Sequence, residues 1–431
     1  MTVKTISPPA KAYARERRIA ERAVHRASIL TKRAISLTPS YWASSPIASQ
    51  PSSRKLSNGE ISKSDASPVT AADFAAQALL ISAIHGAFPA DSFIGEEDAD
   101  SLRRDPLLAI QVFDFVQQYS TVQLVSDDDD DDDKDEPLYT PTTIEEMFHI
   151  IDLGGRGTGG RTGRFWALDP IDGTATFVKG QQYAVSLALI EDGREVVGVL
   201  GCPNLKLPEG GGEIEETSVD DEGVGLLLSA VRGGQGSTYR PMGWEGSKLR
   251  PARKIEDLRR GLSAASTLTQ DGHSNGYVRK TTLKDSGVVE LGDLHFIDST
   301  VSTATCSKKV RQLADAAGVA YPGTELYSSH MRYVALIFGG RGAVQVRVPN
   351  SRHSANCIWD HAGAQLIYTE SGRGKVTDLN GKPVDFGTGR KLSGNYGIIT
   401  ADESVHGKVL ELVRDMLDDS SSSSSSSTTS S

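Results

Sequence analysis

Two carboxylates stand three positions apart in the segment Leu168-Asp169-Pro170-Ile171-Asp172-Gly173-Thr174, near the middle of the 431-residue chain. A second acidic pair, Glu96-Glu97, follows a glycine upstream, and Asp360 follows a tryptophan far downstream. Mg²⁺ prefers oxygen ligands and is usually held by a few carboxylates together with phosphate oxygens of a substrate. The three acidic segments therefore indicate metal-assisted phosphate chemistry.

The turn at the centre of this pattern has residue types that fit such chemistry. Asp169 at the end of a strand and Asp172 in the turn can direct their oxygens into one space, and the carbonyl of Ile171 can add a neutral oxygen. Gly173 allows the backbone to approach a phosphate closely. Thr174 is expected to cap the next helix, whose N–H groups would receive phosphate oxygens. The alternative is an ordinary Asp-Gly turn without a ligand.

The composition is that of an ordinary globular protein, with 24% charged and 38% hydrophobic residues. The length suits two domains or one large α/β domain. The formal net charge is -10, but residues 127–136 alone carry about -8, so the acidity is local and says little about partners. No apolar run reaches the ~18 residues of a membrane span. We expect a soluble protein that binds neither nucleic acid nor membranes.

The three cysteines, Cys202, Cys306 and Cys357, are widely spaced and odd in number, which favours a reducing compartment over a disulfide framework. We therefore expect a cytoplasmic location. Several arginines between Arg15 and Arg33 resemble a mitochondrial transit peptide. The favoured alternative is a surface helix over residues 12–36 with an apolar stripe.

The rest of the chain alternates between helical and extended patterns, which predicts a layered α/β fold. We expect helices at 71–86, with Asp73 in the first turn, at 305–317 and from Trp359 onward. Strands are expected at 92–95, 164–168, 183–190, 195–201, 225–231, 333–338 and 343–348. The predicted domains are 1–215, carrying the acidic motifs, and 216–417. Segments 39–63 and 127–136 and the polyserine tail 418–431 are expected to be disordered.

The Asp169–Thr174 motif, with Gly95-Glu96-Glu97 before it and Trp359-Asp360-His361-Ala362-Gly363 after it, resembles the inositol monophosphatase superfamily of Mg²⁺-dependent, lithium-sensitive phosphatases. Within it the chain is more similar to the 3′(2′),5′-bisphosphate nucleotidases, the fungal ones above all. The likeness includes residues 67–77, 182–185, 201–205 and 384–390, and covers most of residues 14–417. It implies an αβαβα sandwich of the α/β (α+β) class, with the active site between its halves.

The resemblance also implies roles for individual residues. The ligands of two or three Mg²⁺ ions fall on Glu96, Asp169, the Ile171 carbonyl, Asp172 and Asp360. The pair that orients the attacking water falls on Asp73 and Thr174. Substrate-binding positions fall on Gly173, Thr174, Ser329, Arg332, Arg347 and Asp360. The family has lysine where this chain has Arg332, and arginine offers a bidentate fork in place of a point charge. The alternative for Arg332 and Arg347 is that of solvated surface cations.

One family feature has no counterpart. A His-Ser-Ser-His-like segment that contacts the nucleotide in the family corresponds to Ser302–Ser307, which contains no histidine. This leaves tight recognition of the bisphosphate, and the possibility of a divergent paralogue, as open questions.

By resemblance we expect a monomeric phosphatase for a small-molecule nucleotide. It would convert adenosine 3′,5′-bisphosphate to AMP and 3′-phosphoadenylyl sulfate to adenylyl sulfate, in sulfate assimilation and salt tolerance. Two alternatives stay open. One is an inositol phosphate phosphatase of the same superfamily, and the other is a catalytically silent regulatory protein with the same fold.

Overall fold

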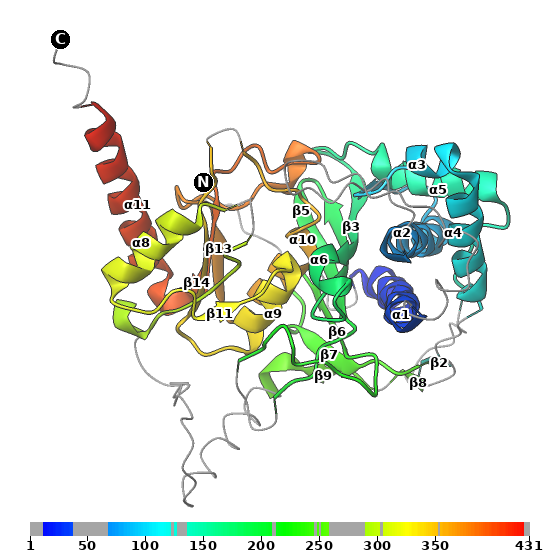
Figure 1. The fold of residues 1–431 in the computed structure, drawn as a ribbon, viewed down its shortest axis with the longest axis horizontal. Helices are drawn as coiled ribbons and strands as arrows, with labels where there is room; N and C mark the ends of the chain where they lie inside the picture. Colours follow the sequence, from blue (N-terminus) through cyan, green and yellow to red (C-terminus); the bar gives the residue numbers. More distant parts are fainter. Residues whose placement is uncertain are drawn as a thin grey trace, which may run out of the picture.

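The computed structural model describes residues 12–37, 68–121, 125–126, 136–208, 213–244, 248–249, 251–257, 289–301, 305–351 and 354–425. Their helices and strands form five layers in the order α, β, α, β, α (Figure 1). The layered α/β sandwich expected from the sequence is thereby confirmed. The connection at 39–63, the aspartate run 127–135 and residues 302–304 lie outside the described residues.

The first sheet has seven strands in the order β1-β3-β4-β5-β6-β7-β9. Their bounds are β1 Ser92–Gly95, β3 Arg164–Asp172, β4 Ala184–Glu191, β5 Arg194–Cys202, β6 Leu226–Val231, β7 Thr238–Pro241 and β9 Arg253–Lys254. A two-stranded pair, β2 Val125–Ser126 and β8 Lys248–Leu249, lies apart from this sheet. β4 and β5 form the expected hairpin, with Asp192-Gly193 at its turn and φ positive at both residues.

The second sheet has five strands in the order β11-β10-β12-β14-β13. Their bounds are β10 His295–Asp298, β11 Thr324–Glu325, β12 Ala343–Arg347, β13 Gly374–Thr377 and β14 Ile398–Asp402. Helices α9 Ser329–Phe338 and α10 Ala362–Glu370 lie between the two sheets and contact both. The outer layer consists of α8 Ser307–Ala317 and α11 Glu403–Ser425. Short 3₁₀ turns occur at η2 Leu291–Asp293 and η3 Phe386–Thr388.

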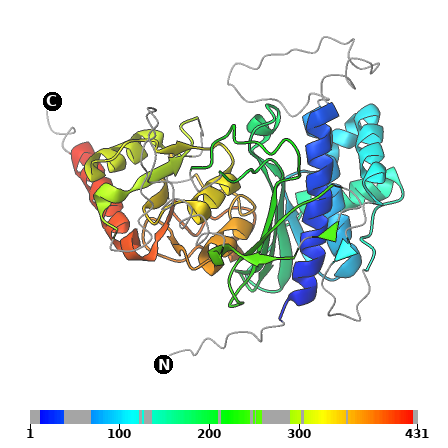
Figure 2. The same cartoon turned by 90° about the horizontal axis from the view of Figure 1, so that it is seen from below.

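The other outer layer covers the first sheet with α1 Ala14–Leu37 and α2 Pro68–Ala87. Farther out lie α3 Asp100–Arg104, α4 Pro106–Gln118 and α5 Ile144–Gly155. Figure 2 shows α1 between the strands on one side and these helices on the other. Residues 19–32 of α1 are all buried, so the surface helix expected here is wrong.

Burial of α1 on every side requires partners for its polar groups. Arg26 donates to the carbonyl of Leu79 at 2.9 Å, and Lys32 donates to Asn204 Oδ1 at 2.6 Å. Glu21 accepts from Arg240 at 2.8 Å. The arginine-rich segment is therefore part of the core, which weighs against the transit-peptide alternative.

Three further expectations differ from what the structure shows. Residues 333–338 are helical, within α9, so the strand expected there is wrong. The sequence could not distinguish the two, because an apolar run that is buried on all sides has no period that separates strand from helix. The expected domain boundary at 215/216 falls inside one sheet, since β6 pairs with β5 in the register Gly201↔Leu227. The first sheet therefore continues past residue 216, through β6 and β7, to Lys254 at the end of β9. At the other end, α11 continues to Ser425, into the segment expected to be a tail.

Candidate active site

Glu96 and Asp169 are placed side by side by strand pairing. β1 and β3 are parallel and in register up to Gly95↔Leu168, so Glu96 and Asp169 are the next residues at the same edge of the sheet. Parallel strands present their carboxyl ends together, which is where ligands bind in open α/β sheets. The register between β3 and β4 shifts between Asp169 and Asp172, and the chain then turns at Gly173.

Gly173 is required by the geometry of this turn. Its φ of 96° lies in the left-handed region, and a Cβ added there would stand 2.9 Å from Cβ of Ser328. Gly173 is also the N-cap of α6, Thr174–Phe177, so the cap expected at Thr174 is wrong by one residue. The hydroxyl of Thr174 instead donates to the Ile171 carbonyl at 3.3 Å.

The carboxylates converge closely enough to perturb one another. Burial raises the pKa of Asp169 well above its usual value, and the charges of Glu96, Asp172, Asp360 and Asp73 raise it further. Burial also raises the pKa of Asp360, as do Asp172 and Glu96, whereas Arg347 and Lys391 oppose this. Asp73 is the sixth residue of α2, in its second turn and not its first, and is 7% exposed. The structure thus places Glu96, Asp172, Asp360 and Asp73 close enough to Asp169 for their charges to raise its pKa.

Arg390 holds two of these segments in place. Its guanidinium donates to the carbonyl of Gly95 at 2.7 Å, directly before Glu96. The same group lies 4.7 Å from the centre of the Trp359 ring, directly before Asp360. Arg390 therefore links the residue before Glu96 with the residue before Asp360. In the sequence Arg390 stands only within a family-like stretch, and no local pattern there predicts this contact.

The first turn of α9 binds the carboxylate of Asp172. Oδ2 of Asp172 accepts from Oγ of Ser328 at 2.5 Å and from the backbone N–H of His330 at 2.6 Å. Ser328 is also the N-cap of α9. Nε2 of His330 lies 2.8 Å from the Trp359 carbonyl, so the same turn reaches the segment of Asp360. Ser328 and His330 were missed, although a serine before an apolar run is a recognisable helix start.

Next to this turn lies a buried cationic pair. Nη2 of Arg332 and Nη1 of Arg347 both donate to Oγ of Ser329, at 3.1 and 3.2 Å. The two arginines are 2% and 3% exposed, so the alternative of solvated surface cations is wrong. Among the described residues neither makes a salt bridge, and Nε of each has no hydrogen-bond partner. Burial lowers the pKa of Arg332 to about 10, with a further contribution from Arg347. Such a site favours an anion.

Arg347 has one more partner, His361. Nη1 of Arg347 lies 3.1 Å from Nε2 of His361, and Nδ1 of His361 lies 3.1 Å from Oη of Tyr333. His361 is fully buried. Burial lowers its pKa well below the usual value, and so does the charge of Arg347.

The donor set fits a hard divalent cation. It consists of buried and half-buried carboxylates that repel one another, with the Ile171 carbonyl nearby, and Mg²⁺ selects such oxygens. Throughout the described ranges, no three Asp, Glu, His or Cys side chains already form a metal-ligating group. Ions would therefore draw the carboxylates inward or bind some of them through water, as Mg²⁺ commonly does.

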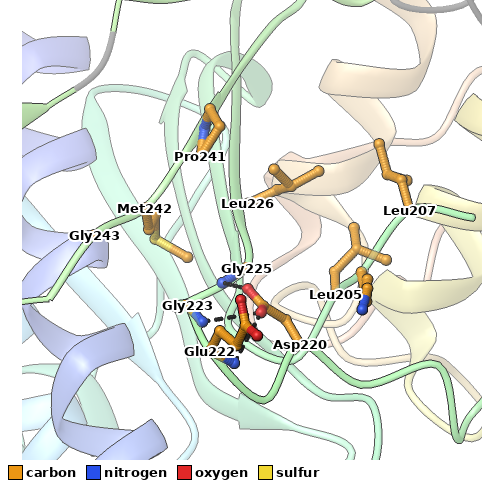
Figure 3. Close-up of a pocket in the computed structure, with 11 residues that line it drawn as sticks. Leu205, Leu207, Asp220, Glu222, Gly223, Gly225, Leu226, Pro241, Met242 and Gly243 are labelled. Atoms are coloured by element: carbon orange, nitrogen blue, oxygen red, sulfur yellow. Dashed lines mark hydrogen bonds between the residues drawn. The ribbon is translucent and has the colours of Figure 1, made fainter. Parts of the chain in front are cut away.

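A cavity of about 460 Å³ lies elsewhere, beside β6 and β7, and contains none of the predicted site residues (Figure 3). Its walls are largely apolar, from residues such as Leu205, Leu226 and Met242. The carboxylate of Asp220 in its floor accepts hydrogen bonds from the backbone N–H groups of Gly223 and Gly225, at 2.9 and 3.0 Å. That carboxylate therefore serves the loop itself.

Fold and site together define a layered α/β sandwich with an acidic, metal-type site at the edge of its first sheet. The sequence profile of the inositol monophosphatase family matches residues 39–417, and the chain belongs to this family. This confirms the resemblance. In the described part of the chain, every helix is too short or too polar to cross a lipid bilayer.

Three of the curated relatives have the same name. The 3′(2′),5′-bisphosphate nucleotidase of Emericella nidulans is 34% identical over 94% of this chain and 99% of its own length. That of Schizosaccharomyces pombe is 34% identical over 92% and 94%, and that of Oryza sativa is 32% identical over 84% and 88%. Among solved structures, Mycobacterium tuberculosis SuhB is 16% identical, covers 94% of this chain and 97% of its own, and has a TM-score of 0.47.

Proposed function

We propose that the protein is a Mg²⁺-dependent phosphatase that removes the 3′-phosphate of adenosine 3′,5′-bisphosphate to give AMP. The main observation behind this proposal is that two adjacent serines at the start of α9 bind groups of opposite charge. Ser328 binds Asp172 of the carboxylate cluster, and Ser329 binds both Arg332 and Arg347. A bisphosphate suits this pairing, since one phosphate can face the metal-type site and the other the arginines. The names of the relatives support the same substrate.

The residues then divide the work. Glu96, Asp169, the Ile171 carbonyl, Asp172 and Asp360 would hold two or three Mg²⁺ ions. When bound, these ions would supply a water of lowered pKa and positive charge for the phosphate oxygens. Asp73 and Thr174 would orient the attacking water, and Asp73 can accept its proton. Gly173 would let the phosphate lie close to the backbone.

The second phosphate would be bound by the arginine pair. Ser329, Arg332 and Arg347 are held by hydrogen bonds before any substrate arrives, so little ordering is required on binding. By the same logic the enzyme would accept 3′-phosphoadenylyl sulfate, whose 5′ group is also anionic, and yield adenylyl sulfate. Roles in sulfate assimilation and salt tolerance, and sensitivity to lithium, belong to this proposal.

Phosphate release tests the proposal. The purified protein should hydrolyse adenosine 3′,5′-bisphosphate with Mg²⁺ and lose activity when the metal is chelated. Inositol 1-phosphate and 3′-AMP, each with a single phosphate, serve as comparisons. A clear preference for inositol 1-phosphate would favour an inositol phosphate phosphatase. No turnover of any of them, with Mg²⁺ bound, would favour a catalytically silent protein.

Location and assembly are part of the proposal. The cysteines Cys202, Cys306 and Cys357 are all free, and the arginine-rich α1 is buried in the core. Both observations support a cytoplasmic protein. The expected monomer stays a prediction, which sedimentation equilibrium tests.

A further inference from the structure

We infer that His361 is a positioning residue: with Tyr333 behind it, it aims the guanidinium of Arg347 at the substrate's second phosphate. The inference rests on the proposed function for the identity of that anion. His361 stands directly after Asp360, but its two hydrogen bonds lead away from the carboxylates, toward Arg347 and Tyr333.

The hydrogen-bond partners fix where the imidazole carries its proton. A guanidinium only donates, so Nε2 of His361 must accept from Arg347 and carries no proton. A neutral imidazole then has its proton on Nδ1, which donates to Oη of Tyr333. His361 is thus an acceptor at the end that meets the cation and a donor at the end that meets the phenol.

This arrangement gives Arg347 an orientation without cancelling its charge. A buried arginine is commonly paired with a carboxylate, which neutralises it. Here the partners of Nη1 are two neutral groups, Oγ of Ser329 and Nε2 of His361, and Nε is left without a partner. The cation is therefore fixed in direction yet keeps unused donor capacity for an incoming anion.

Tyr333 completes the support because it fixes the ring of His361. It lies on α9, five residues after the N-cap Ser328, and is fully buried. Its ring meets that of His361 edge to face, with centroids 5.9 Å apart. One helix thus carries Ser329, which accepts from Arg347, and Tyr333, which holds the ring of His361.

His361→Leu tests the inference through a difference between two substrates. The KM for adenosine 3′,5′-bisphosphate should rise about 10- to 100-fold, the range for losing a hydrogen bond to a charged group. The kcat should change little, because the bond acts on binding. The KM for 3′-AMP, which lacks the 5′-phosphate, should stay the same. His361→Gln keeps an acceptor for Arg347 and should restore much of the affinity.

A matched control and a double-mutant cycle separate positioning from general damage. His406 is also a buried histidine, hydrogen-bonded to Thr377 in the far core, so His406→Leu should lower stability without changing either KM. Adding His361→Leu to Arg347→Met should leave the KM where Arg347→Met alone puts it. An equal KM rise for both substrates, or additive effects in the cycle, would overturn the inference.

Two measurements do not depend on turnover. Nitrogen-15 NMR of the histidine rings should show His361 neutral and protonated at Nδ1, and a proton at Nε2 would overturn the inference. Calorimetry should show that His361→Leu weakens AMP binding by the same factor as the KM. If His361→Leu does not fold, Tyr333→Phe, which loses only the hydroxyl, should produce a smaller KM rise confined to the bisphosphate. If wild-type protein binds AMP but hydrolyses no bisphosphate, the proposed function fails while these measurements still judge the role of His361.

Discussion

Ser328, the N-cap of α9, donates a 2.5 Å hydrogen bond from Oγ to Oδ2 of Asp172, the last residue of β3. The two residues are 156 positions apart in the sequence. The same Oγ accepts from the backbone N–H of Met331, which makes Ser328 the cap of α9. One hydroxyl therefore starts the central helix and orients a carboxylate of the metal-type site. Stability and activity should depend on it in separable ways.

Ser328→Ala should lower the free energy of unfolding by about 1 kcal/mol through loss of the cap. It should also lower Mg²⁺ affinity by about 10- to 100-fold, the usual effect of removing a group that orients a metal ligand. Thr143→Ala is the matched control, since Thr143 caps α5 by accepting from Glu146 and lies outside the site. Urea denaturation and Mg²⁺ titration of activity measure both quantities. Equal Mg²⁺ affinity in the two variants would contradict the role given to Ser328.

Part of the acidic site was predictable because local sequence patterns mark its residues. Asp169 and Asp172 share one turn, Glu96 ends a strand, and strand pairing alone aligns Gly95 with Leu168. Turn chemistry is a short-range rule that a sequence exposes directly, whereas the pairing of β1 with β3 is a long-range contact that the structure reveals. Asp360 stood out as a third acidic position and the family resemblance supplied Asp73, but no local rule predicts that either lies close to Asp169.

The supports of the site were not predictable, because they depend on contacts across the fold. Arg390 lies almost 300 positions from the Gly95 carbonyl it binds. Likewise α9 was expected to be a strand at 333–338, since its residues are buried on every side and show no period. Only the packing of α9 between two sheets reveals the partners of three consecutive side chains. Ser328 binds Asp172, Ser329 binds the arginine pair, and the ring of His330 meets the Trp359 carbonyl.

Asp172→Asn should reduce turnover by more than about 100-fold. This exceeds the loss of about 10- to 100-fold that is typical when a residue that only hydrogen-bonds to a metal ligand is replaced. Asparagine keeps an oxygen that can accept from Ser328 and His330, so the fold around the site should persist and the missing charge is what is tested. Asp105→Asn is the control, because Asp105 only caps α4 and asparagine caps equally well. Phosphate release at saturating Mg²⁺ is the measurement. An unchanged rate would refute the metal role of Asp172.

Arg332→Lys should raise the KM for adenosine 3′,5′-bisphosphate by about tenfold or more. Arg332 spreads its donors over the Leu326 carbonyl at 3.1 Å and Ser329 Oγ at 3.1 Å, which a single ammonium cannot reproduce. Arg104→Lys, at an exposed position of α3, should change nothing. Since the family has lysine here, an unchanged KM would show that position 332 supplies only charge.

His25 should make folding stability depend on pH. Burial, together with the charge of Arg240, lowers its pKa from 6.5 to about 4, although the hydrogen bond to the Gly243 carbonyl opposes the shift. Between pH 6.5 and about 4, His25 therefore binds a proton in the unfolded chain but stays neutral in the folded chain. The free energy of unfolding consequently falls as the pH falls through this window. From pH 7 to pH 5 the loss is on the order of 2 kcal/mol at 1.36 kcal/mol per pH unit.

The His25 contribution is isolated by comparing variants. His25→Gln can still donate to the Gly243 carbonyl, which Nε2 meets at 2.7 Å, but cannot take up a proton. Its unfolding free energy in urea should drop less between pH 7 and pH 5 than that of the wild type. His149→Gln, at an exposed site on α5, should keep the wild-type slope. Parallel pH dependences in all three proteins would show that His25 protonates freely when folded.

Removal of residues 127–135 should leave catalysis intact, because the proposed site residues and the partners found for them among the described residues all lie outside this run. Glu136 has to stay, since its carboxylate accepts from Arg15 at 3.0 Å and its carbonyl accepts from Arg22 at 2.7 Å, so Glu136 itself is bound to α1. The deletion changes the formal net charge from -10 to about -3. Less repulsion of an anionic substrate should raise kcat/KM slightly in dilute buffer, and the gain should vanish near 0.15 M salt, where the Debye length is about 8 Å. A loss of activity that persists at that salt concentration would instead place the aspartate run in the machinery of the enzyme.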